Sequence, residues 1–390
     1  MAERIYYADC YATEFDATVL HVEPSDGRQL VRLDRTAFYP TSGGQPFDTG
    51  TLDAARVVDV IDDDGGDVLH VVEGGTLSPG ARVAGRVDWT RRFDHMQQHT
   101  GQHVLSAAFD RLFGARTESF HLGADHATID LAKELSPEQI GKAEADANRI
   151  VWEDHPVSIA FVDAADAAAM PLRKDPARSG LLRLVDVDGY DLSACGGTHV
   201  ARTGAIGIIA VTGWERFKGG LRVGFACGGR ALSSHRRLRD TTASSIRLLS
   251  VLPEELPAAI ERIQADAKES RRTIRNLQEQ LAGHEADRLA RTASNQRVVG
   301  ALDGWDQAGL KAIASALAAR EGFAAALVST SAPAAIVVAA HPAAVVNSAE
   351  VLKKVIARFG GKGGGRPELA QGGGLSGEPG VIADYLRELL

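Results

Sequence analysis

Cysteine is scarce in this sequence, and its placement is informative. The 390 residues include three cysteines, Cys10, Cys195 and Cys227, which are odd in number and far apart in the chain. This pattern argues against a disulfide framework. It favours a reducing compartment in which one cysteine serves as a metal ligand.

Long apolar runs are absent as well. The N-terminal residues MAERIYYADC contain no apolar segment of signal-peptide length, and no stretch approaches the roughly 18 uncharged apolar residues of a membrane-spanning helix. Hydrophobic residues make up 44% of the chain and charged residues 24%, which are ordinary values for a soluble protein. The sequence therefore predicts a cytoplasmic protein without a membrane partner, and its length predicts roughly two to four domains.

The chain has no overall excess of positive charge. Its formal net charge of −8 argues against nonspecific coating of nucleic acid. The segment 216–239 nevertheless contains seven basic residues and no acidic one, which indicates either a solvated surface or a directed RNA contact. The candidate RNA-binding residues are Arg216, Lys218, Arg222, Arg236 and Arg237, together with Lys362 and Arg366 near the C-terminus.

Two familiar catalytic motifs are missing. A zinc protease of the His-Glu-x-x-His type needs a glutamate directly after its first ligand, and the residue after His99 is Thr100. A phosphate-binding loop needs Gly-Lys-Ser/Thr, whereas Lys362 is followed by Gly363. The glycine-rich run 360–367 therefore predicts a structural loop or a backbone contact with RNA phosphate.

The periodicity predicts an α+β multidomain fold. Residues 1–88 contain short β-branched runs at 18–22, 30–33, 57–61 and 68–72, separated by turns, and favour a small β-barrel. Within them, the glycine pair of 38-FYPTSGGQP-46 indicates a barrel corner or a substrate-facing loop.

The rest of the chain is predicted to form three further segments. Residues 89–245 begin with a helix that ends at Gly114 and continue with strands and a second helix, as expected of an α+β domain. Residues 246–294 carry apolar positions four and three apart from Leu256 to Leu281, the seam of a coiled coil or long helical hairpin that packs on the chain itself or forms a homodimer. Residues 295–390 are expected to be a glycine-rich α/β domain, which offers a second surface for homodimer formation.

Two fragments place metal-binding side chains four residues apart. His95, His99 and His103 follow helical spacing, and one ion cannot reach both His95 and His103 because eight helical residues rise roughly 12 Å. Gly101 disfavours a helix unless something approaches it, which favours the pair His99 and His103. The second fragment is Cys195-Gly196-Gly197-Thr198-His199, whereas Cys227-Gly228-Gly229 lacks the matching histidine and indicates a buried structural thiol.

Together, these fragments resemble the metal signature of the second additional domain of alanyl- and threonyl-tRNA synthetases. The run 38-FYPTSGGQ-45 and the terminal glycine-rich segment resemble the large form of the alanyl-tRNA editing proteins, AlaX, whose C-terminal domain resembles that of DHH-type phosphoesterases. Ser42 departs from the family's loop, which commonly has a third glycine there. No Asp-His-His motif occurs, so phosphoester hydrolysis is not implied.

The resemblance implies a freestanding editing protein that acts on tRNA charged by a separate enzyme. It implies one Zn²⁺ ion per chain on His99, His103, Cys195 and His199, and hydrolysis of the aminoacyl ester of alanine tRNA mischarged with serine, with glycine as a further candidate. The barrel begins too near the N-terminus to leave room for a synthetase catalytic domain, so we do not expect aminoacylation. The candidate substrate-recognition residues are Thr100, Gln102, Ser119, Gly43, Gly44 and Gln45.

Alternatives from other classes stay open. Four protein ligands are typical of a structural zinc, whereas catalytic zinc usually keeps an open position. The chain is therefore also compatible with a tRNA-binding module that has a structural zinc and no hydrolytic role. A third hypothesis is an RNA-dependent regulator that dimerises through the 256–281 seam.

Overall fold

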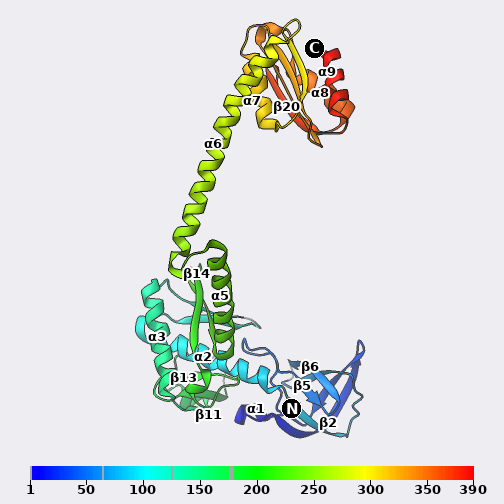
Figure 1. Cartoon of the computed structure of the whole chain (residues 1–390). Coiled ribbons are helices and arrows are strands. Elements are labelled where there is room, and N and C mark those ends of the chain that lie inside the picture. The colour runs from blue at the N-terminus through cyan, green and yellow to red at the C-terminus, as the bar shows by residue number, and fades with distance from the viewer. Residues whose placement is uncertain (1, 64–65, 124–125, 175–179) are drawn as a thin grey trace. The chain divides into compact units, whose positions relative to one another are not determined.

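The computed structural model describes the whole chain except residues 1, 64–65, 124–125 and 175–179. The chain divides into two compact units, Met1–Ser244 and Ser245–Leu390, and each has hydrophobic cores of its own (Figure 1). The expected multidomain α+β fold with a β-barrel is confirmed. No helix in the described part of the chain has both the length and the apolar character needed to cross a membrane.

A closed six-stranded barrel forms the N-terminal part of the first unit. Its antiparallel strands follow the order β2-β3-β7-β6-β5-β8. Their bounds are β2 (Glu14–Ser25), β3 (Arg28–Leu33), β5 (Gly50–Leu52), β6 (Ala55–Asp62), β7 (Val68–Glu73) and β8 (Arg82–Val87). Before the barrel, β1 (Glu3–Arg4) leads into α1 (Ile5–Ala8) and pairs in parallel with β4 (Arg35–Thr36).

Four of the six barrel strands contain the predicted β-branched runs, and two were not predicted. β5 is only three residues long, which is too short for an alternating pattern. β8 is interrupted by Gly85, where a Cβ atom would lie 2.3 Å from the ring of Phe15. Phe15 stands directly opposite Gly85 on the neighbouring strand β2, and close packing between these two strands, rather than strand propensity, explains this glycine.

The rest of the first unit is built around one long helix. α2 (Trp89–Phe113) begins after Asp88, whose carboxylate accepts a hydrogen bond from the Arg91 backbone N–H at 3.3 Å, and ends at Gly114 in the left-handed conformation. The following elements are β9 (Thr117–Leu122), β10 (Ala127–Leu131), α3 (Pro137–Glu153), β11 (Val157–Asp163), α4 (Ala164–Ala167), β12 (Leu181–Val187), β13 (Asp191–Ala194), η1 (Thr203–Ile206), β14 (Ile209–Phe217), β15 (Gly220–Cys227) and α5 (Gly228–Leu249).

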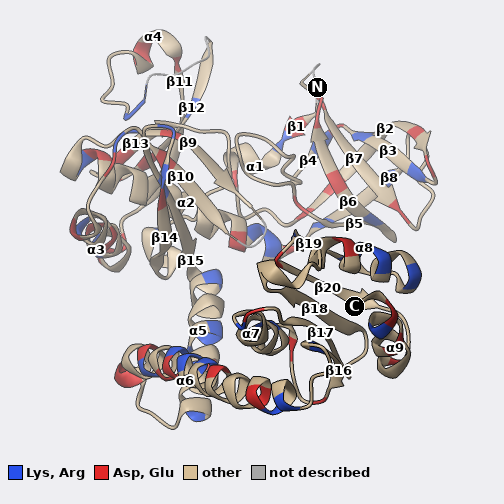
Figure 2. Cartoon of the chain, turned by 90° about the horizontal axis from the view of Figure 1, so that it is seen from above, with Lys and Arg blue, Asp and Glu red and all other residues tan. Residues whose placement is uncertain are grey.

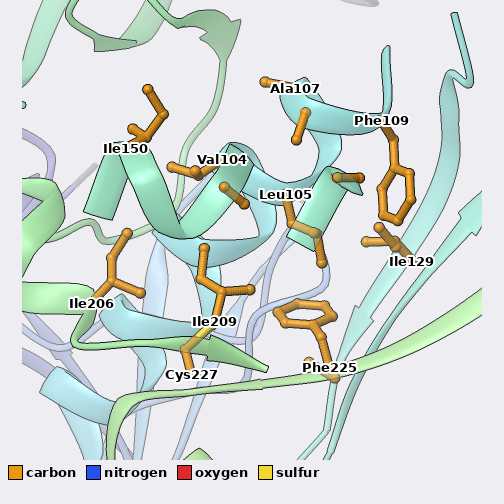
Figure 3. Close-up of a cluster of buried hydrophobic side chains, with 14 of the residues drawn as sticks. Val104, Leu105, Ala107, Phe109, Ile129, Ile150, Ile206, Ile209, Phe225 and Cys227 are labelled. Carbon is orange, nitrogen blue, oxygen red and sulfur yellow. The ribbon is translucent and has the colours of Figure 1, made fainter. Parts of the chain in front are cut away.

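These elements form two small sheets around α2. One has the order β14-β15-β10-β9 and the other β11-β12-β13. Figure 3 shows the core in which Val104 and Leu105 of α2 lie with Ile150 of α3 and Phe225 of β15. Strand β14 begins at Ile209, shortly after the short helix η1 ends at Ile206. Because α2 is covered by α3 and by strands, it can carry buried polar side chains in fixed positions.

The second unit contains a long helix and a five-stranded sheet. The sheet has the order β16-β17-β18-β20-β19, with α7 against one face and α8 and α9 against the other. The bounds are η2 (Pro253–Glu255), α6 (Leu256–Arg291), β16 (Arg297–Leu302), α7 (Gln307–Ala318), β17 (Ala324–Ser329), β18 (Ala334–Ala340), η3 (Pro342–Ala344), α8 (Ser348–Phe359), β19 (Lys362–Arg366), β20 (Leu369–Leu375) and α9 (Pro379–Leu389).

The glycine-rich run near the C-terminus is a strand, and the prediction of a loop was wrong. Lys362–Arg366 form β19, an exposed edge strand that pairs with β20. A Cβ atom on Gly363 or Gly365 would lie within 2.6 Å of the β20 backbone, so only glycine allows these two strands to approach so closely.

The predicted 256–281 seam lies on α6, which is a single helix rather than a hairpin. Acidic and basic residues are interspersed along it (Figure 2). The seam residues Ile260, Ile274 and Leu281 are 43–57% exposed, while Ala282 and Ala286 are buried against the sheet domain. The C-terminal end of α6 therefore belongs to the core of the second unit, and association through the seam stays a prediction.

Candidate metal centre and substrate pocket

Four side chains converge beside α2. His99 and His103 lie one turn apart on α2, and Cys195 and His199 lie in the loop that follows β13. One ligand atom from each residue lies within 4.8 Å of all the others, and the four residues are the ones that the sequence singled out. His95 is buried one turn earlier on α2 and lies outside the cluster, so the structure brings the later histidine pair to Cys195.

The distances within this cluster suit a metal ion. The Cys195 Sγ atom lies 3.4 Å from Nε2 of His99 and 3.3 Å from Nε2 of His199. Tetrahedral Zn²⁺ with ordinary Zn–S and Zn–N bonds places such atoms roughly 3.5 Å apart. The set of three imidazoles and one thiolate is also the chemistry that zinc prefers. The residues present therefore fit a zinc ion.

Two glycines make room for buried side chains at and beside the cluster. A Cβ atom on Gly197 would lie 2.1 Å from Cε1 of His99, so a larger residue would displace that imidazole. In α2, a Cβ atom on Gly101 would lie 2.3 Å from Cys227 Sγ. The atom that approaches the helix at Gly101 is thus the sulfur of Cys227, a buried thiol whose pKa is raised by burial.

The electrostatics of the cluster favour a thiolate at Cys195. Burial opposes ionisation of Cys195, but His99, His199 and His103 outweigh it and lower the pKa of the thiol well below its ordinary value. Burial also disfavours the charged form of His103, yet hydrogen bonds with Asp191 and Cys195 raise its pKa to about 9. Burial lowers the pKa of His199 to about 3. The surroundings of Cys195 therefore favour its thiolate, which is the form of cysteine that binds a metal.

Each imidazole in the cluster also contacts a polar group through Nδ1. The partners are Gln45 for His99, Asp191 for His103 and Thr100 for His199. Asp191 was not among the predicted residues. Its position four residues before Cys195 could have suggested it, since a carboxylate commonly orients a ligating histidine.

The cluster borders a cavity of about 480 Å³. Its wall combines the segment 37–49 between β4 and β5, here called the barrel loop, with α2, β9 and β13. It includes four of the predicted substrate-recognition residues, Gly43, Gly44, Gln102 and Ser119. Gln102 is 2% exposed, and its Oε1 has no hydrogen-bond partner in the described part of the chain. Its Nε2 donates to Ser106 Oγ at 2.8 Å.

The other predicted recognition residues have their polar atoms engaged. The Ser119 hydroxyl donates to Asp130 at 2.6 Å, and Asp130 is itself paired with Arg222. Thr100 and Gln45 are fully buried, do not line the cavity and are bound to histidines. A substrate in the cavity would therefore meet Gln102 as the recognition residue with unused hydrogen-bonding capacity.

The predicted RNA-binding residues are scattered over both units. Arg216 and Lys218 lie near the turn between β14 and β15, where Arg216 pairs with Glu134 at 3.1 Å. Arg222 is occupied by Asp130. Arg236 and Arg237 are exposed on α5, where the ribbon of Figure 2 is blue at basic residues, and Lys362 and Arg366 are exposed at the ends of β19.

Three known families match successive parts of the chain. Residues 8–91 match tRNA synthetases class II (A), residues 182–223 match the threonyl and alanyl tRNA synthetase second additional domain, and residues 295–389 match the DHHA1 domain. The alanyl-tRNA editing protein AlaX-L of Pyrococcus horikoshii is 32% identical, and the alignment covers 100% of this chain and 98% of that protein. The chain belongs to the AlaX family of alanyl-tRNA editing proteins.

Relatives of the AlaX family include much longer proteins. The alanine–tRNA ligase of Pyrococcus abyssi is 34% identical over 94% of this chain, and that of Halobacterium salinarum is 37% identical over 96%. The chain spans only 41–42% of the length of these two ligases. The match to the second additional domain contains Cys195 and His199, whereas His99 and His103 lie upstream of it.

Proposed function

We propose that this protein is a trans-editing hydrolase that deacylates alanine tRNA mischarged with serine, with glycine as a second candidate amino acid. The observation that carries the proposal is the metal-binding cluster beside a cavity, in a chain that aligns along its whole length with an alanyl-tRNA editing protein. The bond that breaks is the ester between the amino acid and the terminal ribose of the tRNA, and water supplies the new hydroxyl.

The proposed cofactor is one Zn²⁺ ion held by His99, His103, Cys195 and His199. When bound, zinc would supply electrostatic stabilisation of the ester or hold the substrate's polar groups. The chain itself shapes the cavity. Gly44 lies at φ 83°, and a Cβ atom there would lie 2.8 Å from the ring of Phe120, so glycine keeps the barrel loop close to β9.

Gln102 is the proposed serine-recognition residue. Its buried Oε1 lacks a partner among the described residues, and the serine hydroxyl is a donor of matching chemistry. A polar site that is paired only by the correct substrate rejects an analogue without the hydroxyl by roughly 10⁴- to 10⁵-fold. Alanine would leave this oxygen unpaired, which protects correctly charged alanyl-tRNA.

Deacylation assays test the function directly. Purified protein is incubated with seryl- and alanyl-tRNA prepared on the same alanine tRNA. We expect rapid hydrolysis of the seryl ester and little of the alanyl ester; equal rates, or no hydrolysis of the seryl ester, would overturn the proposal.

Substitution of Gln102 tests its role in that selectivity. Gln102→Leu should lower the rate on seryl-tRNA at least 100-fold and reduce the preference over alanyl-tRNA. Ser106→Ala is the matched control, because it removes the Nε2 partner of Gln102 and leaves Oε1 in place. If Gln102→Leu keeps full selectivity, another group recognises serine.

A second candidate function follows from the closed ligand set. Four protein ligands are typical of structural zinc, and a tRNA-binding module without hydrolytic activity would need no open position on the metal. His99→Ala separates the two. Loss of hydrolysis with folding and tRNA binding retained supports the hydrolase, whereas unfolding on loss of the metal supports the module.

We also propose that the exposed neighbours Arg236 and Arg237 of α5 contact the tRNA backbone. Arg236 and Arg237 have no ion-pair partner in the described part of the chain. Neutralising them should weaken tRNA binding and lessen its dependence on salt, because each phosphate contact releases counterions.

A further inference from the structure

Each of the three histidines of the cluster has a polar partner at Nδ1, one of its two ring nitrogens. Each imidazole is bound at Nδ1 by a polar atom from a different place: the barrel loop for His99, β13 for His103 and α2 itself for His199. Which ring nitrogen carries the proton decides whether the other has a lone pair for a metal. The partners of these three Nδ1 atoms can settle that question.

The tautomer of His99 follows from Gln45. Nδ1 of His99 lies 2.8 Å from Oε1 of Gln45, and the same Oε1 lies 3.1 Å from the backbone N–H of Thr198. A backbone N–H can only donate, so the atom it faces must be the amide oxygen rather than the amide nitrogen. Gln45 Nε2 then donates to Thr198 Oγ1 at 2.8 Å. An oxygen opposite Nδ1 requires that Nδ1 of His99 carries the proton.

The tautomer of His199 follows from Thr100. The Thr100 hydroxyl lies 2.9 Å from the carbonyl oxygen of Met96, which can only accept, so its one hydrogen is used there. The same oxygen accepts from the Val200 backbone N–H at 3.1 Å. Nδ1 of His199, 3.2 Å away, must then be a donor as well.

Asp191 settles the state of His103. Its carboxylate accepts from Nδ1 of His103 at 3.0 Å, from the Ser193 hydroxyl at 3.0 Å and from Nε of Arg173 at 2.5 Å. Three donors on one buried carboxylate leave it as an acceptor only. Nδ1 of His103 therefore carries a proton, as it does in the other two histidines.

We infer that Gln45, Thr100 and Asp191 are positioning residues of the metal centre. They hold all three histidines with the proton on Nδ1, which leaves the Nε2 lone pair of each ring for one ion beside the Cys195 sulfur. Without these acceptors, each ring could turn or place its proton on Nε2, and the ion would lose a ligand. The inference rests on the proposed metal centre but not on the proposed substrate.

The barrel contributes to this centre through one anchored loop. Asp48, at the far end of the loop from Tyr39, is buried and pairs with Arg92 of α2, which is also buried. Asp48 further accepts from the Tyr39 backbone N–H at 2.7 Å, and Arg92 donates to the Cys10 carbonyl at 2.8 Å. Both ends of the loop are thus tied together and to α2, and Gln45 is kept over His99.

The test measures metal binding in the full-length protein by competition with a chromophoric chelator. Gln45→Met keeps the side chain's length and removes the acceptor, and we expect zinc affinity to fall roughly 10- to 100-fold. Gln45→Glu keeps an oxygen opposite Nδ1, and Thr198 can donate its hydroxyl hydrogen to the second oxygen, so zinc affinity should stay at or above that of the wild type.

A second matched pair and a spectroscopic readout guard against misfolding of one variant. Thr100→Val should lose affinity and Thr100→Ser should keep it, because only serine retains the hydroxyl. Asp191→Asn should also lose affinity, since either orientation of the amide turns an N–H group toward His103 or Arg173. In the cobalt-substituted protein, the variants that lose affinity should show altered visible absorption, which reports ligand geometry.

The outcomes are decisive in either direction. Loss in Gln45→Met and Thr100→Val, with retention in Gln45→Glu and Thr100→Ser, supports the inference. Wild-type affinity in Gln45→Met, Thr100→Val and Asp191→Asn would show that these residues only fill space. Loss in Gln45→Glu as severe as in Gln45→Met would overturn the assigned tautomer of His99. Because no tRNA is used, these results are independent of whether the protein hydrolyses seryl-tRNA.

Discussion

The two glycines of Cys-Gly-Gly-Thr-His are unequal at the scale of single residues. A Cβ atom on Gly197 would lie 2.1 Å from Cε1 of His99 and 3.0 Å from Oε1 of Gln45. The nearest atom to a Cβ on Gly196 is the Tyr7 hydroxyl at 3.7 Å, an ordinary contact. One glycine therefore makes room for a ligand, and its neighbour in the chain has space to spare.

This difference predicts how the metal centre responds to a single methyl group. Gly197→Ala should reduce the zinc content of the purified protein far below one ion per chain, because His99 must move. Gly196→Ala, its matched control, should keep the zinc content of the wild type. Metal analysis of both variants checks the prediction, and equal zinc in the two would show that the His99 ring has room to adjust.

Burial of a histidine in the barrel predicts a dependence of stability on pH. His70 is fully buried, Nδ1 lies 3.1 Å from the Val31 carbonyl and Nε2 lies 2.8 Å from the Thr36 hydroxyl. Burial lowers its pKa from 6.5 to about 4. The unfolded chain therefore binds a proton below pH 6.5 that the folded barrel does not bind until about pH 4. Stability is complete above pH 6.5 and falls between these two values.

The size of this loss follows from the size of the shift. At 1.36 kcal/mol per pKa unit, acidification from pH 7 to pH 4 should cost about 3 kcal/mol through His70. His70→Phe removes the titrating group, so its unfolding free energy should change less over the same range. Urea unfolding of both proteins at the two pH values measures the difference, because every titrating group other than His70 is present in each. Identical pH profiles would contradict the prediction.

At the scale of elements, α2 owes its position to the close approach of β15. Gly101 occurs in the middle of the helix, where glycine costs roughly 1 kcal/mol relative to alanine. The structure explains that cost by the Cys227 sulfur, which occupies the space that a Cβ atom would need. Close packing of helix against strand fixes the helix that carries the candidate metal ligands His99 and His103, which lie on either side of Gly101 in the sequence.

Replacing a glycine inside a helix by alanine ordinarily stabilises a protein, and at Gly101 we expect the opposite. Gly101→Ala is expected to destabilise the protein by about 1–3 kcal/mol through overpacking. Gly141→Ala, in an open and exposed position of α3, should stabilise it by up to about 1 kcal/mol. Cys227→Ala should restore much of the loss in Gly101→Ala, since the two Cβ atoms would then lie 3.5 Å apart. Thermal unfolding of the three single variants and of the double variant Gly101→Ala/Cys227→Ala tests this coupling.

At the scale of the whole molecule, the candidate metal centre belongs entirely to the first compact unit. The barrel and the α2 core lie within Met1–Ser244, and the cores of α6 and of the five-stranded sheet lie within Ser245–Leu390. Each unit buries apolar surface of its own, so each is expected to fold alone.

A fragment of residues 1–249 tests this independence. It retains α5 to its end and should fold and bind one zinc ion with the affinity of the full chain. Sedimentation of the fragment beside the full-length protein also tests the predicted seam: a dimeric full chain and a monomeric fragment would place association in the second unit. A fragment that binds no zinc would show that the second unit supports the centre.

The sequence by itself determined the parts that local patterns encode. β-branched runs indicated most of the barrel, capping and periodicity bounded α2, and the spacing of His99 with His103 and of Cys195 with His199 indicated a metal site. Each of these signals lies within a few residues of chain, where side-chain direction follows from the secondary structure.

Only the tertiary structure decided which polar atoms face one another across the chain. It brought Gln45 from the barrel loop to His99, Asp191 to His103 and Cys227 to Gly101. It also showed that the Thr100 hydroxyl contacts His199 and does not line the cavity. It also turned the glycine-rich run 362–366 into a strand. These contacts join residues distant in sequence and depend on close packing to within a few tenths of an ångström, which no local pattern records.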